Sequence, residues 1–176
     1  MFKKAICIVI FSFVALFLFS CAKVSGSITD ELDDGPTSEQ IVNTLVTAAP
    51  SPDGYQTVDE DYISRMNFGE KYTNLLDAVA DWCIVTSKRH EVNADMIGVF
   101  RLKSSADIPL AASVINEYLA AQRQRMATAY SGYAPDQIPK IDNAEVTRCG
   151  NYFLVTFLEE SREDAVEDMF EDMLEG

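Results

Sequence analysis

The chain is poor in the residues that mark fibrous, disordered and nucleic-acid-binding proteins. Only eight of its 176 residues are glycine and six are proline, whereas 48% are hydrophobic, so collagen-like and low-complexity chains are excluded. Basic residues are also few, because 14 Lys and Arg stand against 28 Asp and Glu, a net charge of −14. Nucleic-acid binders need a basic patch that displaces counterions from phosphates. We therefore expect one globular unit with no nucleic-acid partner.

The patterns of metal, redox and hydrolytic sites are missing as well. The sequence has one histidine, His90, and no Cys-x-x-Cys pair, so it has neither a multi-histidine metal site nor a zinc or thioredoxin-like motif. No segment shows the EF-hand order of acids, a phosphate-binding glycine loop or a nucleophile elbow. We predict no metal, no cofactor and no catalytic residue, with His90 a solvated group in a polar loop. Calcium held by the acidic clusters at 30–34 and 59–61 and by the acids of the final helix is the alternative.

The first twenty residues have the features of a secretory signal. Lys3 and Lys4 precede an almost wholly apolar run, Ala5 to Phe19, which is short for a transmembrane span. The run ends at Ser20 and Cys21 and resembles the bacterial lipobox, whose cysteine is joined to diacylglycerol and becomes the new N-terminus. We predict a signal peptide that is cleaved between Ser20 and Cys21, with Cys21 lipidated. An ordinary signal peptide and an N-terminal anchor helix are the alternatives, and all three place the body outside the cytoplasm.

Loss of the leader leaves a strongly acidic body. Because both leader charges are basic, residues 21–176 carry 12 bases and 28 acids, a net charge of −16. Lipid rather than charge would then hold this body to the membrane. Residues 21–36 are rich in Gly, Ser, Thr and Asp, which is typical of a flexible tether, and a single domain follows at 37–176. We predict a location on the extracytoplasmic face of the cell membrane, with an unknown envelope protein or ligand as partner.

Helix and strand signals alternate through the domain. Thr37 and Gln40 form a capping box at a helix start, and Gly150-Asn151 has the composition of a hairpin turn. The expected elements are helix 37–49, helical pieces 59–67 and 70–79, strands 83–86 and 96–103, helix 107–131, a short turn or helix at 133–139, strands 145–149 and 152–157, and a helix from 161. This order predicts an α+β fold: an antiparallel sheet of about four strands, its hairpins flanking a long helix, with helices packed on one face.

The last predicted helix has a single apolar face. Acidic residues occupy its remaining positions, which argues against insertion into an anionic membrane surface. The face therefore packs on the domain's own sheet or docks into a partner's groove, and self-packing is the default because burial of such a face stabilises most helices. The apolar face consists of Val166, Met169, Phe170, Met173 and Leu174.

Two sets of side chains leave alternatives open. Cys83 and Cys149 lie in predicted strands, where an oxidising exterior permits a disulfide and where buried thiols serve equally as small apolar residues. We favour buried thiols, because a domain of this length is stable without a covalent link. The seven tyrosines form either a binding platform or the edge of the core.

Several short segments follow one another in a particular order: Ala94–Phe100, Gln122–Arg125, Tyr133–Gln137, Ala144–Val146 and Gly150–Tyr152. In this order they resemble a family of small Gram-positive bacterial lipoproteins that carry a domain of unknown function. The resemblance spans about residues 60–160 and implies membrane attachment and no known enzymatic activity, and it supplies no site residues. We therefore expect a lipid-anchored, non-enzymatic binding module. The alternative is an envelope hydrolase that uses scattered carboxylates, which requires two facing carboxylates in a cleft, at least one of them desolvated.

Overall fold

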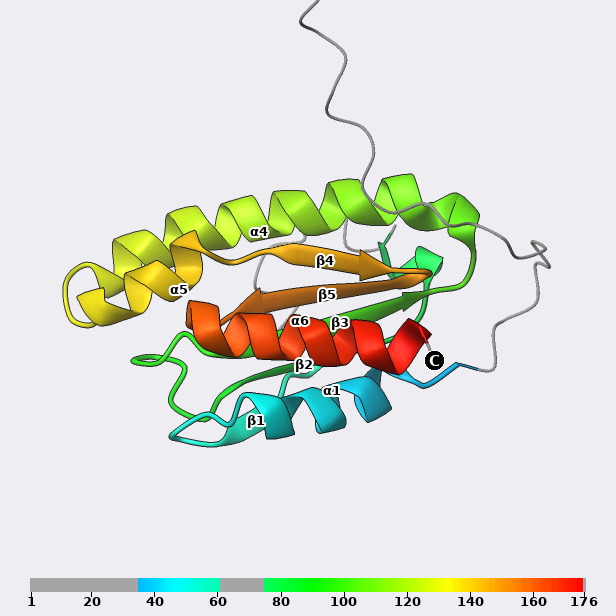
Figure 1. The fold of residues 1–176 in the computed structure, drawn as a ribbon. Coiled ribbons are helices and arrows are strands. Elements are labelled where there is room, and N and C mark those ends of the chain that lie inside the picture. Colours follow the sequence, from blue (N-terminus) through cyan, green and yellow to red (C-terminus); the bar gives the residue numbers. More distant parts are fainter. Residues whose placement is uncertain (1–34, 61–74, 176) are drawn as a thin grey trace, which may run out of the picture. The chain divides into compact units, whose positions relative to one another are not determined.

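An antiparallel sheet forms the centre of the fold, and helices cover both of its faces (Figure 1). The structure is a computed structural model that describes residues 35–60 and 75–175. The predicted signal peptide, Cys21, most of the tether and the helical piece 59–67, except its first two residues, lie outside these ranges. In chain order the elements are α1 (Ser38–Ala48), β1 (Tyr55–Thr57), β2 (Val79–Ser87), β3 (Met96–Leu102), the 3₁₀ turn η1 (Ser105–Asp107), α4 (Ile108–Tyr130), η2 (Pro135–Gln137), α5 (Ile138–Asp142), β4 (Val146–Cys149), β5 (Tyr152–Phe157) and α6 (Glu160–Glu175).

The sheet has the strand order β1-β2-β3-β5-β4, and every neighbouring pair is antiparallel. The predicted α+β fold, with hairpins flanking the long helix α4, is confirmed. The fifth strand is β1, in which Tyr55 pairs with Ser87 at the end of β2. Three residues are too few to show the alternation that predicts a strand, and β1 is held by its pairing with β2.

Strand β2 begins four residues earlier than predicted. Of the expected helical piece 70–79, residues 70–74 lie outside the described ranges and residues 75–78 are helical, whereas Val79 already pairs with Leu102. Asp81 is a weak strand former, but its carboxylate accepts a hydrogen bond from Arg101 Nε at 2.8 Å. This hydrogen bond from the neighbouring strand outweighs the low intrinsic strand propensity of Asp81.

Helices lie on both sheet faces, so the expectation of helices on one face was wrong. Ile84 and Phe100 face α4, whereas Cys83, Val99 and Leu154 face α1 and α6. The reason is that β3 and β5 are apolar at nearly every position and are buried almost throughout. Strands with two apolar faces need a cover on each side.

The C-terminal helix packs on its own domain, as predicted. Val166 and Phe170 are fully buried, and they share a hydrophobic cluster with Leu45 of α1 and Leu154 of β5. Thr37 caps α1 in the predicted capping box, and Gly150, with φ +56°, lies in the β4–β5 hairpin turn. Over the described residues no helix combines the length and apolar character needed to cross a bilayer.

The first described residues are fastened to one end of the sheet. Arg101 donates a hydrogen bond to the Gly35 carbonyl at 3.3 Å, and the Tyr152 hydroxyl donates one to the Pro36 carbonyl at 3.0 Å. The Ser38 amide donates to Asp81 Oδ1 at 2.8 Å. The last two residues of the predicted tether therefore enter the body where β3 ends and β5 begins.

Candidate functional site

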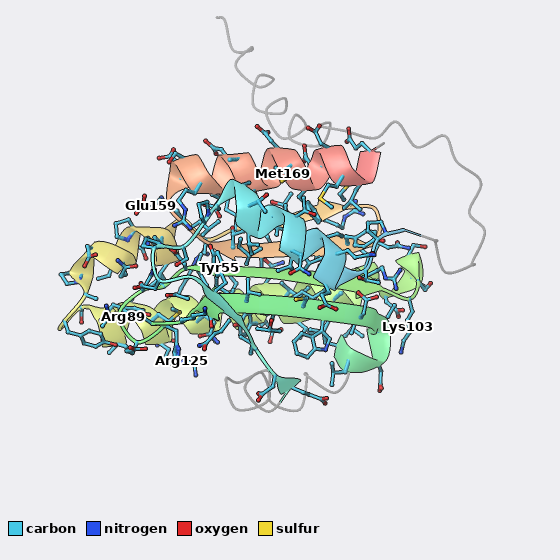
Figure 2. The ribbon with its side chains drawn as sticks, turned by 90° about the horizontal axis from the view of Figure 1, so that it is seen from below. Tyr55, Arg89, Lys103, Arg125, Glu159 and Met169 are labelled. Atoms are coloured by element: carbon cyan, nitrogen blue, oxygen red, sulfur yellow. The ribbon has the colours of Figure 1, made fainter. Side chains whose placement is uncertain are left out.

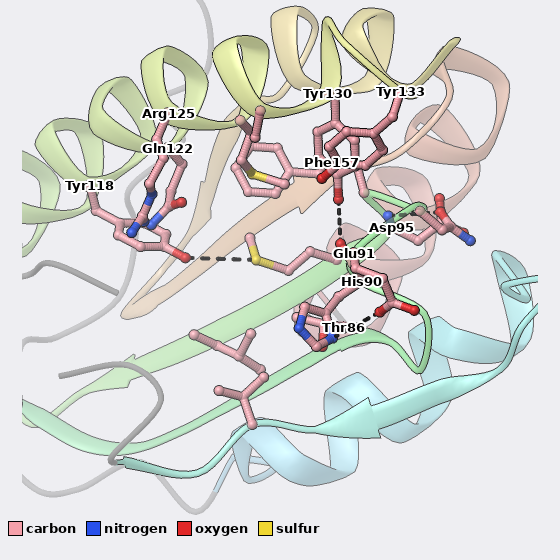
Figure 3. A pocket seen from close by; sticks show the side chains of 17 residues that line it. Thr86, His90, Glu91, Asp95, Tyr118, Gln122, Arg125, Tyr130, Tyr133 and Phe157 are labelled. Atoms are coloured by element: carbon pink, nitrogen blue, oxygen red, sulfur yellow. Dashed lines mark hydrogen bonds and ion pairs between the residues drawn. The ribbon is translucent and has the colours of Figure 1, made fainter. Parts of the chain in front are cut away.

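A pocket of about 250 Å³ lies between α4 and the opposite end of the sheet, where β3 begins and β5 ends (Figure 3). Its floor comes from the sheet and its roof from α4, and the turn between β2 and β3 borders it. Most of its wall is apolar. The apolar lining residues include Val58, Ile84, Met96, Met126 and Phe157.

The side chains along α4 explain why the pocket opens at this end. Ile115 and Leu119 fill the space between the helix and the sheet nearer the N-terminus of α4. Further along, the α4 residues that line the pocket include Gln122, Met126 and Ala129. Ala129 is short and Met126 is unbranched, so this part of the helix leaves a gap that branched residues would fill.

Two polar groups lie deep in the otherwise apolar wall. Thr86 of β2 is 7% exposed, and its Oγ1 is buried with no hydrogen-bond partner among the described residues. Gln122 of α4 is 1% exposed and brings a carboxamide to the same pocket. Nearby, the Tyr118 hydroxyl lies 3.8 Å from Met96 Sδ and donates a weak hydrogen bond to it. A buried hydroxyl without a partner costs free energy, so Thr86 is an unsatisfied polar group in this wall.

The mouth of the pocket carries aromatic and charged groups. Tyr133 is 59% exposed, and its ring lies 5.7 Å from that of Tyr130, whose hydroxyl donates a hydrogen bond to the His90 carbonyl. His90 is half exposed at this mouth, beside Glu91. Arg125 approaches from α4, and Figure 2 shows it at the same end of the body as Arg89, away from Lys103.

A buried ion network borders the pocket. Asp95 is 1% exposed, and its Oδ1 lies 2.8 Å from Lys140 Nζ while Arg162 Nη1 lies 3.1 and 3.0 Å from its two oxygens. Burial raises the pKa of Asp95, but the hydrogen bond from Lys140 and the charges of Lys140 and Arg162 outweigh it and hold that pKa below its usual value. Asp95 is therefore a charged anchor and does not act as a proton donor near neutral pH.

Arg162 extends this network to α1 and β1. Its Nη2 donates to the carbonyls of Ala49 and Pro50 at 2.9 and 3.1 Å and lies 3.1 Å from the Tyr55 hydroxyl. Burial is the main reason that the pKa of Tyr55 rises to about 12. One side chain of α6 thus joins β3, β1 and the end of α1, and the network keeps the pocket's border in place.

The two cysteines of the domain are free thiols. Cys83 is buried and Cys149 half-buried, and burial raises the pKa of Cys83 to about 11. The register leads from Cys83 through Val99 and Leu154 to Thr147, which is three strand spacings away. Three spacings are about 14 Å, whereas a disulfide needs Cα atoms within about 7 Å. The sheet therefore keeps the two thiols apart.

Among the described residues, the carboxylates at the pocket are not two facing groups of the kind that a glycan hydrolase uses. The two at the pocket are Glu91, which is exposed, and Asp95, which is paired with cations. Glu163, whose pKa burial raises to about 7, accepts a hydrogen bond from Thr156 on the other sheet face. Within the described ranges no three His, Cys, Asp or Glu side chains come together as metal ligands. The acidic cluster 30–34 lies outside these ranges.

The sequence analysis singled out some of the residues that line the pocket but did not predict the pocket itself. Three of the seven tyrosines, Tyr118, Tyr130 and Tyr133, line it. Tyr118 and Tyr130 are buried and Tyr133 is exposed, so the alternatives of a binding platform and of the edge of the core both stay open. The missed polar residues are Thr86 and Gln122. The sequence did indicate that Gln122 is unusual, because its carboxamide interrupts the apolar stripe of the long helix. Thr86 gave no such indication, since a β-branched residue is ordinary in a strand.

The chain was compared with protein-family models, with curated proteins and with solved structures, and none of the three comparisons gave a match. The resemblance to the Gram-positive lipoprotein family therefore stays a prediction.

Proposed function

We propose that this chain is a lipid-anchored protein of the extracytoplasmic membrane face whose folded body binds a small, largely apolar ligand. The observation that carries the proposal is the pocket between α4 and the sheet, with apolar walls and a few converging polar groups, the usual character of a small-molecule site. An apolar cavity of about 150 Å³ holds benzene. By that measure about 250 Å³ accepts a ligand of about ten non-hydrogen atoms.

Binding without catalysis fits the charges at the pocket better than hydrolysis does. A glycan hydrolase needs an acid with a raised pKa facing a second carboxylate. At this pocket the pKa of Asp95 is lowered by Lys140 and Arg162, which form ion pairs with its carboxylate. The hydrolase alternative therefore has less support than the binding module.

The proposed anchor is tested at Cys21. Changing Cys21 to Ala in the full chain removes the thiol that would carry the lipid, so metabolic labelling with a fatty acid is expected to lose its signal. The folded body is expected to keep its circular dichroism spectrum, because every described core residue lies beyond residue 40. Label retained on the variant would refute the anchor.

The proposed pocket is tested with a matched pair of variants. Ala129 lines the pocket from α4 and is exposed at its mouth, whereas Ala121 is exposed on the same helix but does not line the pocket. We expect the full chain in lipid nanodiscs to bind 4-fluorotoluene, as followed by ¹⁹F NMR against empty nanodiscs. Ala129→Phe is expected to weaken this binding at least tenfold, and Ala121→Phe to leave it unchanged. Equal binding by both variants would remove the pocket from the proposal.

A further inference from the structure

The aromatic and sulfur groups of the pocket favour a flat, aromatic ligand. Tyr118, Tyr130 and Phe157 contribute three rings to the lining, and Met96 and Met126 contribute two thioethers. Rings stack edge to face or offset on other rings, and methionine sulfur makes favourable contacts with aromatic edges. A saturated chain would forgo both interactions. The wall is therefore best matched by one or two fused aromatic rings.

The buried hydroxyl of Thr86 indicates that this ligand carries a polar group. Thr86 lies in the pocket wall, and its Oγ1 is buried without a hydrogen-bond partner among the described residues. Native proteins rarely leave such a group without a partner, and where the chain supplies none the partner is an ordered water or a bound molecule.

The deep polar groups also indicate that the ligand's polar group is uncharged. Thr86 and Gln122 are both neutral, and an ion buried beside neutral groups loses its hydration without compensation. The ionised side chains of the lining do not offer one sign of charge, because Arg125 and Glu91 both line the pocket and Asp95 is already paired with Lys140.

We infer that the pocket selects a neutral aromatic molecule bearing one hydroxyl or carbonyl group, and that Thr86 recognises this group by a hydrogen bond. The inference rests on the proposed function and adds the ligand's class and the residue that determines specificity. Thr86 Oγ1 serves as donor to a carbonyl or as acceptor from a hydroxyl.

The test compares two probes that differ in one group. 4-Fluorophenol carries the hydroxyl, and 4-fluorotoluene replaces it with a methyl group. Affinities of the full chain in nanodiscs are measured by ¹⁹F NMR, with empty nanodiscs as the blank, for the unchanged protein, Thr86→Val and Thr86→Ser. Valine keeps the shape of threonine without the hydroxyl, and serine keeps the hydroxyl.

Thr86→Val is expected to lose affinity for only one of the two probes. A hydrogen bond contributes about 0.5–1.5 kcal/mol, so Thr86→Val should weaken 4-fluorophenol binding about three- to tenfold. Its affinity for 4-fluorotoluene should stay the same, and Thr86→Ser should bind 4-fluorophenol like the unchanged protein.

Two results would overturn the inference while the proposed function stands: 4-fluorophenol binding that survives in Thr86→Val, or Thr86→Ser behaving like Thr86→Val. Absence of binding of both probes to the unchanged protein would instead overturn the proposed function, and the inference with it.

Discussion

Asp95 and Lys140 form an ion pair in the interior, with Nζ and Oδ1 2.8 Å apart and the side chains 0% and 7% exposed. Arg162 adds a second cation at 3.0 Å from the same carboxylate. The three residues come from the start of β3, from α5 and from α6. The Asp95 carboxylate therefore links three segments of the chain. Removal of this anion should have a different effect on stability from removal of one of the two cations.

Replacing Asp95 by Asn is expected to be much more destabilising than replacing Lys140 by Met. The first change takes the shared carboxylate from both cations, of which Lys140 keeps only the exposed Glu159 at 3.9 Å. Removal of one partner of a buried ion pair costs about 3–5 kcal/mol. The second change leaves Asp95 paired with Arg162. Urea denaturation of both variants measures the difference in the free energy of unfolding. Equal losses would show that Arg162 does not compensate.

Glu163 should make the domain less stable as the pH rises from about 4.5 to about 7. Burial raises the pKa of this carboxyl from 4.5 to about 7, and Glu167 and Glu145 add to the effect while the Thr156 hydrogen bond opposes it. The folded state thus binds a proton that the unfolded state releases in this interval, so the contribution is full below pH 4.5 and lost through pH 7. The shift corresponds to at most about 3 kcal/mol.

The matched variant for this prediction is Glu163→Gln, which keeps the shape without the ionisation. Its unfolding free energy, measured by urea denaturation from pH 4 to 8, should lack the decline, and above pH 7 it should exceed that of the unchanged protein. Asp95 acts in the opposite sense: its lowered pKa gives a contribution that is present above pH 4 and lost in stronger acid. Parallel pH profiles for the unchanged protein and Glu163→Gln would contradict the assignment.

Phe170→Asp is expected to cost 3 kcal/mol or more, on the order of the loss of a buried aromatic ring plus the burial of a charge. Phe170 is 0% exposed between α6, α1 and the sheet. Asp168→Ala, an exposed position on the same helix, is the control and should change stability by less than about 0.5 kcal/mol. Thermal and urea unfolding provide the measurement, and an unchanged melting temperature for Phe170→Asp would rule out the packing of α6 described above.

Thr86→Val should stabilise the ligand-free protein by about 1 kcal/mol, because it replaces an unsatisfied buried hydroxyl by a methyl group of the same shape. The same change is expected to weaken binding of 4-fluorophenol. A variant that gains stability while it loses affinity shows that the hydroxyl serves the ligand rather than the fold. Thr86→Val that loses stability would mean that the hydroxyl already has a partner.

Local signals predicted most of the elements. The Thr37–Gln40 capping box and the turn at Gly150-Asn151 act within a few residues of chain, so their boundaries agree with the structure. Strand β1 and the early start of β2 depend on pairing with distant strands. We predicted helices on one sheet face only, although β3 and β5 are apolar on both of their faces and therefore need a layer of helices on each side.

The candidate site was much harder to predict than the fold. Lys140 and Arg162 lie 45 and 67 positions from Asp95, so no spacing rule connects the three. Thr86 and Gln122 line the same pocket only because α4 crosses the sheet at that point. A gap in packing is a property of the assembled helix and sheet, and single-sequence periodicity contains no measure of it.

The fastening of Gly35 and Pro36 places the chain's point of entry far from the pocket. Arg101 and Tyr152 hold these residues at one end of β3 and β5, and the pocket lies at the other end, beside Met96 and about 17 Å away along the strand. A force applied through Gly35 would therefore act first on these two hydrogen bonds, and the pocket mouth stays clear of the point where the chain enters the body.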